Sequence, residues 1–270
     1  MVVTRILAIS PHLDDAVLSF GAGLAQAAQN GAKVTVYTVF AGVARPPYSP
    51  AAERMHSIWG ISPDEDAVLH RQKEDIAALG HLGAEHVHGE FLDSIYRKAP
   101  DGRWLTDHVE GRQKLKIEKQ APESNLALFS EVKAAIGSVV GEFAPTLIVT
   151  CAALSAHIDN EITRDASLAV ASERGIPIRL WEDIPHATFG SGKIELPRGF
   201  RLGDPAFGSV ESEARTRKFQ ALELYPSQLV MFDGPEKNFF GALDEHAGKN
   251  SPDGGYGEVS WPVIVPESDS

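Results

Sequence analysis

A short polar segment near the start of the sequence carries side chains that could bind a metal ion and move a proton. His12, Asp14 and Asp15 follow the apolar run 5–9, which predicts a buried strand, and precede the helical pattern of residues 15–30. His12 and Asp15 have the spacing of a metal-ligand pair, which leaves the carboxylate of Asp14 free to act as a base. Ligands of open α/β sheets bind where strands end, so these residues stand where a site is expected.

A second segment has the same design. His157, Asp159 and Asn160 follow the strand-like run 146–151 and precede a helical pattern over residues 161–174. If the two strands are neighbours, both sets of side chains converge at one crevice. Imidazole and carboxylate ligands suit Zn²⁺, which lowers the pKa of a bound water to about 7. A simpler alternative stays open, because Asp and Asn are favoured N-caps and these side chains could serve only to cap the two helices.

The remaining patterns supply the elements that must position these residues. Apolar and β-branched runs predict strands, with weaker patterns for the last three, at 5–9, 34–40, 86–91, 146–151, 178–181, 193–196, 200–202 and 259–265. Helical periodicity is found at residues 15–30, 65–79, 123–143, 161–174 and 209–224. This alternation predicts an α/β fold with a mostly parallel sheet flanked by helices.

The 270 residues are predicted to form a single α/β domain. Residues 1–185 would form its core and residues 186–270 would complete it. Segments 41–64 and 98–122 are expected to lie over the site, the first with a short helix near 52–59, because long segments after strand ends often cover substrates. The Gly-rich and charged region beyond Met231 is interpreted as a tail before the final strand.

Composition narrows the classes of partner. The net charge of −12 argues against nucleic acid or an anionic membrane as the main partner, because both require a basic surface. No apolar run is long enough to span a bilayer, and no signal peptide is evident. The lone cysteine, Cys151, suits the cytoplasm, where we expect the protein to reside. Oligomeric state does not follow from the sequence.

Ordered motifs resemble those of the LmbE-like (PIG-L type) zinc-dependent N-deacetylase family. Residues 11–15, Pro-His-Leu-Asp-Asp, are similar to the family's PHPDD signature. Residues 157–160, His-Ile-Asp-Asn, stand where the family has His-x-Asp-His. Weaker similarities occur in order at residues 71–80, 91–97, 181–185 and 218–228.

The resemblance implies a Rossmann-like fold, one Zn²⁺ (or another divalent metal) per chain, and removal of an N-acetyl or other N-acyl group from an amino sugar or sugar conjugate. By position, His12 and Asp15 would bind the metal. Asp14 would be the general base for attack of metal-bound water on the amide. His157 would stabilise the oxyanion or act as an acid, oriented by Asp159.

The resemblance also implies that Arg71 binds substrate hydroxyl or anionic groups. One position departs from the family, because Asn160 replaces the histidine that normally supplies the third zinc ligand. A neutral amide oxygen is a weak ligand for zinc. Three alternatives follow: Asn160 binds the metal, His157 takes its place, or the site is degenerate and the chain is a binding or regulatory protein.

Two smaller expectations concern residues around the motifs. Ser155 occupies a position where some members of the family carry a tyrosine that assists the oxyanion. Trp59 and Trp104 could stack on the face of a sugar, whereas Trp181, in a predicted strand, is more consistent with core packing.

Overall fold

The computed structural model describes residues 3–107, 116–117, 122–154, 157–184, 187, 193–232, 238–251 and 255–264. Its strands are β1 (Arg5–Ser10), β2 (Lys33–Thr38), β3 (Glu85–His88), β4 (Thr106–Asp107), β5 (Lys116–Ile117), β6 (Leu147–Cys151), β7 (Ile178–Trp181), β8 (Arg201–Leu202), β9 (Ala206–Val210) and β10 (Tyr256–Ile264). Its helices are α1 (Asp15–Gln29), α2 (Pro50–Ile58), α3 (Ala67–Leu82), η1 (Ser94–Tyr96), α4 (Pro122–Phe143), α5 (Ile158–Arg174), α7 (Ser212–Leu222), α8 (Pro226–Phe232) and α9 (Phe239–Lys249).

The order of the strands brings the two polar segments together. The main sheet runs β3-β2-β1-β6-β7-β10-β8, with β9 paired to β10. Strands β1, β2, β3, β6 and β7 are parallel, and β10 is antiparallel to its neighbours. The chain moves outward from β1 to β3 and then returns to β6 on the other side of β1. The crevice between β1 and β6 is therefore the switch point at which open α/β sheets bind ligands.

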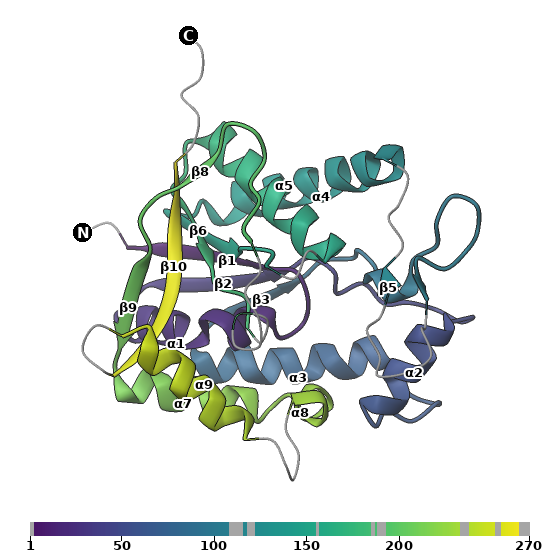
Figure 1. The fold of residues 1–270 in the computed structure, drawn as a ribbon, viewed down its shortest axis with the longest axis horizontal. Helices are drawn as coiled ribbons and strands as arrows, with labels where there is room; N and C mark the ends of the chain where they lie inside the picture. The colour runs from purple at the N-terminus through teal and green to yellow at the C-terminus, as the bar shows by residue number, and fades with distance from the viewer. Residues whose placement is uncertain are drawn as a thin grey trace.

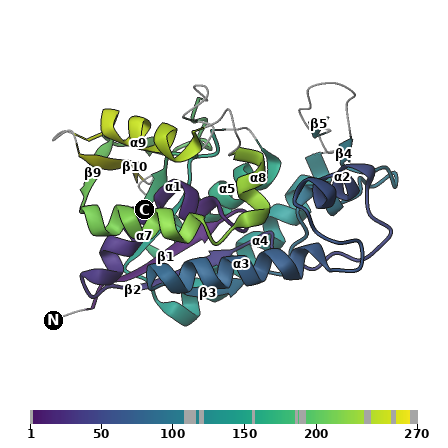
Figure 2. The ribbon, with the colours of Figure 1, turned by 90° about the horizontal axis from the view of Figure 1, so that it is seen from below.

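Helices cover both faces of this sheet (Figure 1). Alternation along β1 sends Leu7 and Ile9 to one face and Ala8 to the other. One face packs against α4 and α5, where Ile136 and Leu168 are fully buried. The opposite face packs against α1, α3 and α7, and α7 lies beside α3 in both views (Figure 1, Figure 2).

The helix that begins at the first motif is broken in its middle. Phe20 has non-helical angles of φ −135° and ψ 19°, which leaves donors of the following turn without helical partners. The carboxylate of Glu258, from β10, accepts the N–H groups of Ala22 at 3.2 Å and Gly23 at 2.7 Å. Lys218 of α7 balances that carboxylate with a 2.6 Å ion pair. A buried ion pair from the C-terminal region thus caps the second half of α1.

A second set of buried polar contacts fixes α3. The hydroxyl of Tyr225 donates to Asp75 at 2.6 Å, and the backbone N–H of Ser227 donates to Glu74 at 3.0 Å. His88 pairs with the other oxygen of Asp75 at 2.8 Å. The weak sequence pattern at 218–228 therefore corresponds to residues that anchor α7 and α8 to the helix that carries Arg71.

Several predictions from the sequence need correction. Residues 193–196 form no strand, whereas 206–210 form β9, which pairs with β10. The region beyond Met231 is not only a tail, because α9 forms there and buries Phe239, Leu243 and Ala247 at helical spacing. The predicted short helix at 52–59 is confirmed as α2, with Ser49 capping it through its hydroxyl. Ser155 and most of 108–121 lie outside the described residues.

No helix in the described part of the chain is both long and apolar enough to cross a membrane.

Candidate active site

The first motif turns sharply after β1. The hydroxyl of Ser10 donates to the carbonyl of His12 at 2.8 Å and accepts the N–H of Ala16 at 3.1 Å, so this turn is tied across its base. Asp14 takes a φ of +135°, a conformation that costs of order 1–3 kcal/mol for a residue with a side chain. Its carboxylate makes no capping hydrogen bond to α1. The alternative that Asp14 is only a helix cap is therefore wrong.

Asp15 belongs to the same turn but faces the imidazole. One oxygen of Asp15 accepts the backbone N–H of His12 at 3.0 Å and lies 3.1 Å from the Nδ1 atom of that ring. Burial opposes ionisation, but the hydrogen bonds and charge of His12 hold the pKa of Asp15 below its usual value. His12 and Asp15 thus form one compact pair of donor atoms at the end of β1.

The second motif begins with the residue that caps α5. The Nδ1 atom of His157 accepts the N–H of Asp159 at 3.2 Å, so the N-cap is His157 and not Asp159 or Asn160. The rings of His12 and His157 meet edge to face with their centroids 5.1 Å apart. Burial lowers the pKa of His157, which favours the neutral ring. A neutral ring that accepts at Nδ1 carries its proton on Nε2.

Asp159 is the most firmly held carboxylate of the site. It is fully buried and pairs with Arg97 at 2.5 Å. Its other oxygen accepts the N–H of Ser94 at 2.9 Å and lies 3.2 Å from the Nε2 atom of His12. Burial opposes ionisation, but Arg97 and His12 lower the pKa of Asp159 below its usual value. Asp159 therefore joins the second motif to the first.

Carboxylates also control the charge of His12. Burial disfavours its protonated form, but Asp93, Asp15 and Asp159 outweigh burial and raise the pKa of His12 well above its usual value. Asp93 lies 3.9 Å from the Nε2 atom of the ring. Donor atoms of His12, His157 and Asp159 lie within 4.8 Å of one another, a group that could hold a metal ion.

Asp14 and Arg71 form the other side of the site. A terminal guanidinium nitrogen of Arg71 donates to the carbonyl of Leu13 at 2.9 Å and lies 3.8 Å from the carboxylate of Asp14. The guanidinium also lies over the ring of Trp59, 4.6 Å from its centroid. Burial and the charge of Asp15 raise the pKa of Asp14 to about 8.

Comparison with known proteins identifies the family. The family model described as PIG-L, GlcNAc-PI de-N-acetylase, matches residues 7–171. The chain belongs to the GlcNAc-PI de-N-acetylase family. The span of the match includes both motifs, Arg71 and the segment from Asp93 to Arg97.

Solved structures of deacetylases are similar over almost their whole length. The zinc inhibited form of teicoplanin deacetylase Orf2 is 64% identical with a TM-score of 0.95, covering 99% of this chain and 100% of that chain. A deacetylase–teicoplanin complex is 63% identical with a TM-score of 0.92, covering 98% and 100%. The A40926 pseudoaglycone deacetylase Dbv21 is 54% identical with a TM-score of 0.85, covering 98% and 99%. A comparison with curated proteins gives no match.

These findings confirm the predicted fold, the family and the class of enzyme, a deacetylase on a Rossmann-like sheet. The structure also brings His12, Asp14, Asp15, His157 and Asp159 to one crevice, as their positions after β1 and β6 predict. Asn160 is buried one position further along α5. Its backbone carbonyl oxygen lies 3.4 Å from the Sγ atom of Cys151.

The sequence did not identify the third segment of the site. Asp93, Ser94 and Arg97 come from η1 and its flanks, which the chain reaches after β3. The sequence contained one indication, the similarity of residues 91–97 to some members of the family. That similarity did not say what Asp93, Ser94 or Arg97 do. Their contacts with His12 and Asp159 are known only from the fold, which places this segment beside the motif that follows β6.

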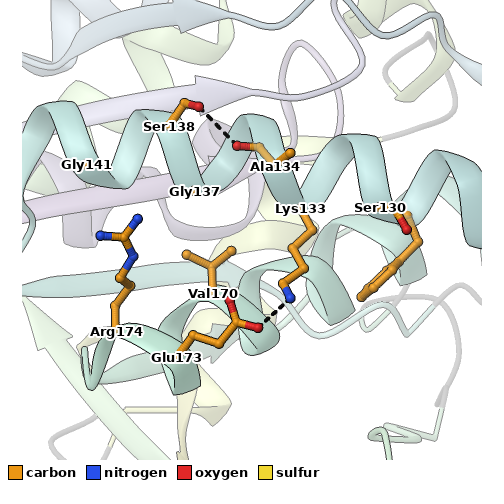
Figure 3. Close-up of a pocket in the computed structure, with 10 residues that line it drawn as sticks. Ser130, Lys133, Ala134, Gly137, Ser138, Gly141, Val170, Glu173 and Arg174 are labelled. Atoms are coloured by element: carbon orange, nitrogen blue, oxygen red, sulfur yellow. Dashed lines mark hydrogen bonds and ion pairs between the residues drawn. The ribbon is translucent and has the colours of Figure 1, made fainter.

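The groove between helices α4 and α5 is not the candidate active site. It has a volume of about 660 Å³ and lies between α4 and α5, on the face opposite α1 and α3. Figure 3 shows that Lys133 and Glu173 form an ion pair across it, beside Gly137 and Ser138. No imidazole is found among the residues that line it. The groove therefore lacks the acid–base groups that gather after β1 and β6.

Proposed function

We propose that this enzyme is a zinc-dependent N-deacylase that removes an N-acetyl or other N-acyl group from the amino sugar of a sugar conjugate. The observation that carries the proposal is the convergence of His12, Asp15 and His157 beside the free carboxylate of Asp14. Relatives at 54–64% identity that are named as deacetylases of teicoplanin and the A40926 pseudoaglycone support a conjugate as the substrate.

The donor set fits a zinc ion. The Nδ1 atom of His12 and an oxygen of Asp15 lie 3.1 Å apart, a separation that two ligands of one ion can have. The opposite ring nitrogen of His12 faces Asp159, and metal-binding histidines are commonly oriented by such a carboxylate. We therefore assign His12 and Asp15 as ligands. When bound, zinc would polarise the acyl carbonyl and increase the acidity of water.

The hydrogen bond at His157 bears on the third ligand. Because Nδ1 of His157 accepts from the backbone, its Nε2 atom carries the proton, 3.4 Å from the hydroxyl of Ser94. A donor at this position suits stabilisation of the negative charge that develops on the acyl oxygen. We assign His157 this role, with Asp159 as the residue that orients the motif, and we assign Asn160 as the third protein ligand.

The remaining residues move the proton and hold the substrate. Asp14 accepts a proton from the attacking water as the oxygen of that water forms a bond with the acyl carbon. His157 donates a hydrogen bond to the acyl oxygen. The bond between carbon and nitrogen then breaks, and the proton taken by Asp14 passes to the leaving amine. The carboxylic acid and the free amino sugar are released. Arg71, beside Asp14, binds hydroxyl or anionic groups of the sugar.

Metal content and turnover together test these assignments. Protein purified without chelators should contain about one zinc per chain by elemental analysis and should release acetate from an N-acetylglucosaminide. Asn160→Ala should lose the metal, whereas His157→Ala should keep the metal and lose turnover. Loss of metal in His157→Ala but not in Asn160→Ala would reverse the two assignments.

The same measurements address the alternative of a degenerate site. In that case the unmodified protein would be empty and inactive, and Asn160→His would restore the metal. That result would overturn the proposed zinc-dependent hydrolysis for this chain.

A further inference from the structure

A second pocket lies next to the segment that completes the active site. It has a volume of about 230 Å³ and is formed by two distant parts of the chain, residues 44–48 and residues 92–104. The side chains that matter for its chemistry are Arg45, Tyr48, Leu92, Tyr96, Lys98 and Trp104.

One short segment serves both the pocket and the active site. Within residues 92–98, Asp93 lies close to His12 and Arg97 pairs with Asp159. The residues that precede them, Leu92 and Tyr96, line the pocket. Tyr48, Leu92 and Tyr96 also pack in the same apolar cluster as Leu13 of the first motif. The pocket therefore borders the same segment that brings Asp93 and Arg97 to the active site.

The walls of the pocket are aromatic and held in place. Tyr48 and Tyr96 have ring centroids 6.0 Å apart, and the hydroxyl of Tyr96 lies 2.8 Å from the Nε2 atom of His56. Trp104 stands across a hairpin from Lys98, with which it forms a β-bridge. Rings fixed in this way offer faces and edges on which a flat ligand can stack.

Both charged residues that line the pocket, Arg45 and Lys98, are cations, in a chain whose net charge is −12. Lys98 lies over the ring of Trp104, 4.4 Å from its centroid, and both Lys98 and Arg45 are exposed. Neither cation forms an ion pair with a carboxylate in the described part of the chain. Two unpaired cations beside aromatic rings complement an aromatic group that carries a negative charge.

Resting on the proposed function, we propose that this pocket binds an aromatic carboxylate within the part of the substrate to which the N-acylated sugar is attached. The ring stacks against Trp104 and the tyrosines, and the carboxylate pairs with Lys98 and Arg45. The pocket would thus select a sugar conjugate over a free amino sugar, whereas the crevice after β1 and β6 acts on the amide.

Direct binding separates this proposal from the proposed hydrolysis. The probe is 4-hydroxyphenylacetate, with its neutral amide as the matched control ligand, titrated by ligand-observed NMR. The acid should bind more tightly than the amide by about fivefold at low salt, the free energy of one charge pair near water. This preference should shrink as ionic strength rises, because salt screens exposed charges.

Variants then locate the binding. Lys98→Glu should abolish the preference for the acid, and Trp104→Leu should weaken both ligands by about tenfold. Arg201→Glu is the matched control, because Arg201 is also exposed but lies on β8, at the other end of the molecule from α2 (Figure 1). It should leave binding unchanged. Thermal unfolding checks that every variant is folded.

Kinetics complete the test. Lys98→Glu should raise KM for the para-carboxyphenyl glycoside of N-acetylglucosamine, while hydrolysis of the methyl glycoside stays the same. Equal binding of acid and amide, or a preference that survives in Lys98→Glu, would overturn the pocket assignment even if both glycosides are hydrolysed. Binding with the expected pattern but without hydrolysis of either glycoside would support the pocket and count against the proposed function.

Discussion

Two carboxylates that follow neighbouring strands, the partly buried Asp14 and the fully buried Asp159, are held in opposite ways. Asp159 has Arg97 at 2.5 Å and the N–H of Ser94 at 2.9 Å, and its pKa is lowered. Asp14 is paired less closely, with Arg71 at 3.8 Å, and burial together with the charge of Asp15 raises its pKa to about 8. The motifs have the same order of strand, loop and helix, so the contrast arises from the partners that the fold supplies.

The comparison separates a carboxylate that holds the site together from one that remains available for chemistry. A carboxylate with direct partners on both oxygens is fixed in position and charge. One that is buried with fewer partners can exchange a proton at neutral pH. When the environments of two acids push their pKa values apart, the two acids can take different roles.

The largest expected effect tests the available carboxylate. Asp14→Asn should lower kcat by about 10³-fold, because an amide cannot accept the proton of water. Zinc content should stay unchanged, as measured by elemental analysis. Asp64→Asn, an exposed position, is the control and should keep full turnover. Undiminished hydrolysis by Asp14→Asn would show that another group is the base.

The next effect tests the carboxylate that holds the site together. Arg97→Met should reduce the free energy of unfolding by about 3 kcal/mol, because it leaves the buried charge of Asp159 without its cation. Urea denaturation measures this change. Arg103→Met is the matched control, because its partner Asp101 is exposed and such pairs contribute little. Equal losses in the two variants would remove the distinction between a held and a free carboxylate.

A third carboxylate, beside the second motif, should make stability depend on pH. Asp183 accepts the N–H of Leu154 at 2.5 Å in the loop before His157, and burial raises its pKa to about 7. The folded state therefore holds a proton that the unfolded state releases near pH 4. Because the unfolded state has then lost this proton while the folded state still holds it, stability should fall by about 2.5 kcal/mol as the pH rises from about 5 to about 8, most of it below pH 7.

The variant Asp183→Asn should lose this dependence. The difference in unfolding free energy between the variant and the unmodified protein should shift in favour of the variant as the pH rises. Urea denaturation at both pH values measures that shift. A difference that does not change with pH would mean that Asp183 is ionised in the folded protein throughout this range.

The smallest effect concerns the segment between the two carboxylates. Ser94→Ala keeps the backbone N–H that Asp159 accepts but removes the hydroxyl that donates to Asp93 at 3.2 Å. We expect a loss of about 1 kcal/mol or less in thermal unfolding, the usual contribution of one hydrogen bond. A loss as large as that of Arg97→Met would show that the hydroxyl, and not the backbone, holds this segment.

Local patterns predicted the parts of the fold that depend on neighbouring residues. The apolar runs before His12 and His157 are strands β1 and β6, and each motif is followed by a helix, as periodicity indicated. The placement of both motifs at one crevice also followed, because adjacent parallel strands end at the same edge. The family motifs added the identity of the chemistry, which spacing alone left open.

Contacts between distant segments could not be predicted in the same way. Nothing around Arg97 indicates that it meets Asp159, because 62 positions separate the two residues. Helix α9 was missed because glycine and charged residues dilute its apolar face, which becomes stable only against the core formed with α7. Strand β9 owes its form to pairing with β10, and its exposed Phe207 gives little pattern on its own.

The break in α1 has a consequence for the order in which the protein assembles. The donors of Ala22 and Gly23 are satisfied by Glu258, a residue 236 and 235 positions further along the chain. Contacts of such long separation form slowly, since loop closure must precede them. During synthesis, the second half of α1 therefore cannot be capped until β10 has been made and has paired with the sheet. The motif of residues 11–15 leaves the ribosome before His157 and Asp159, yet the helix that follows it is completed only after β10 has formed.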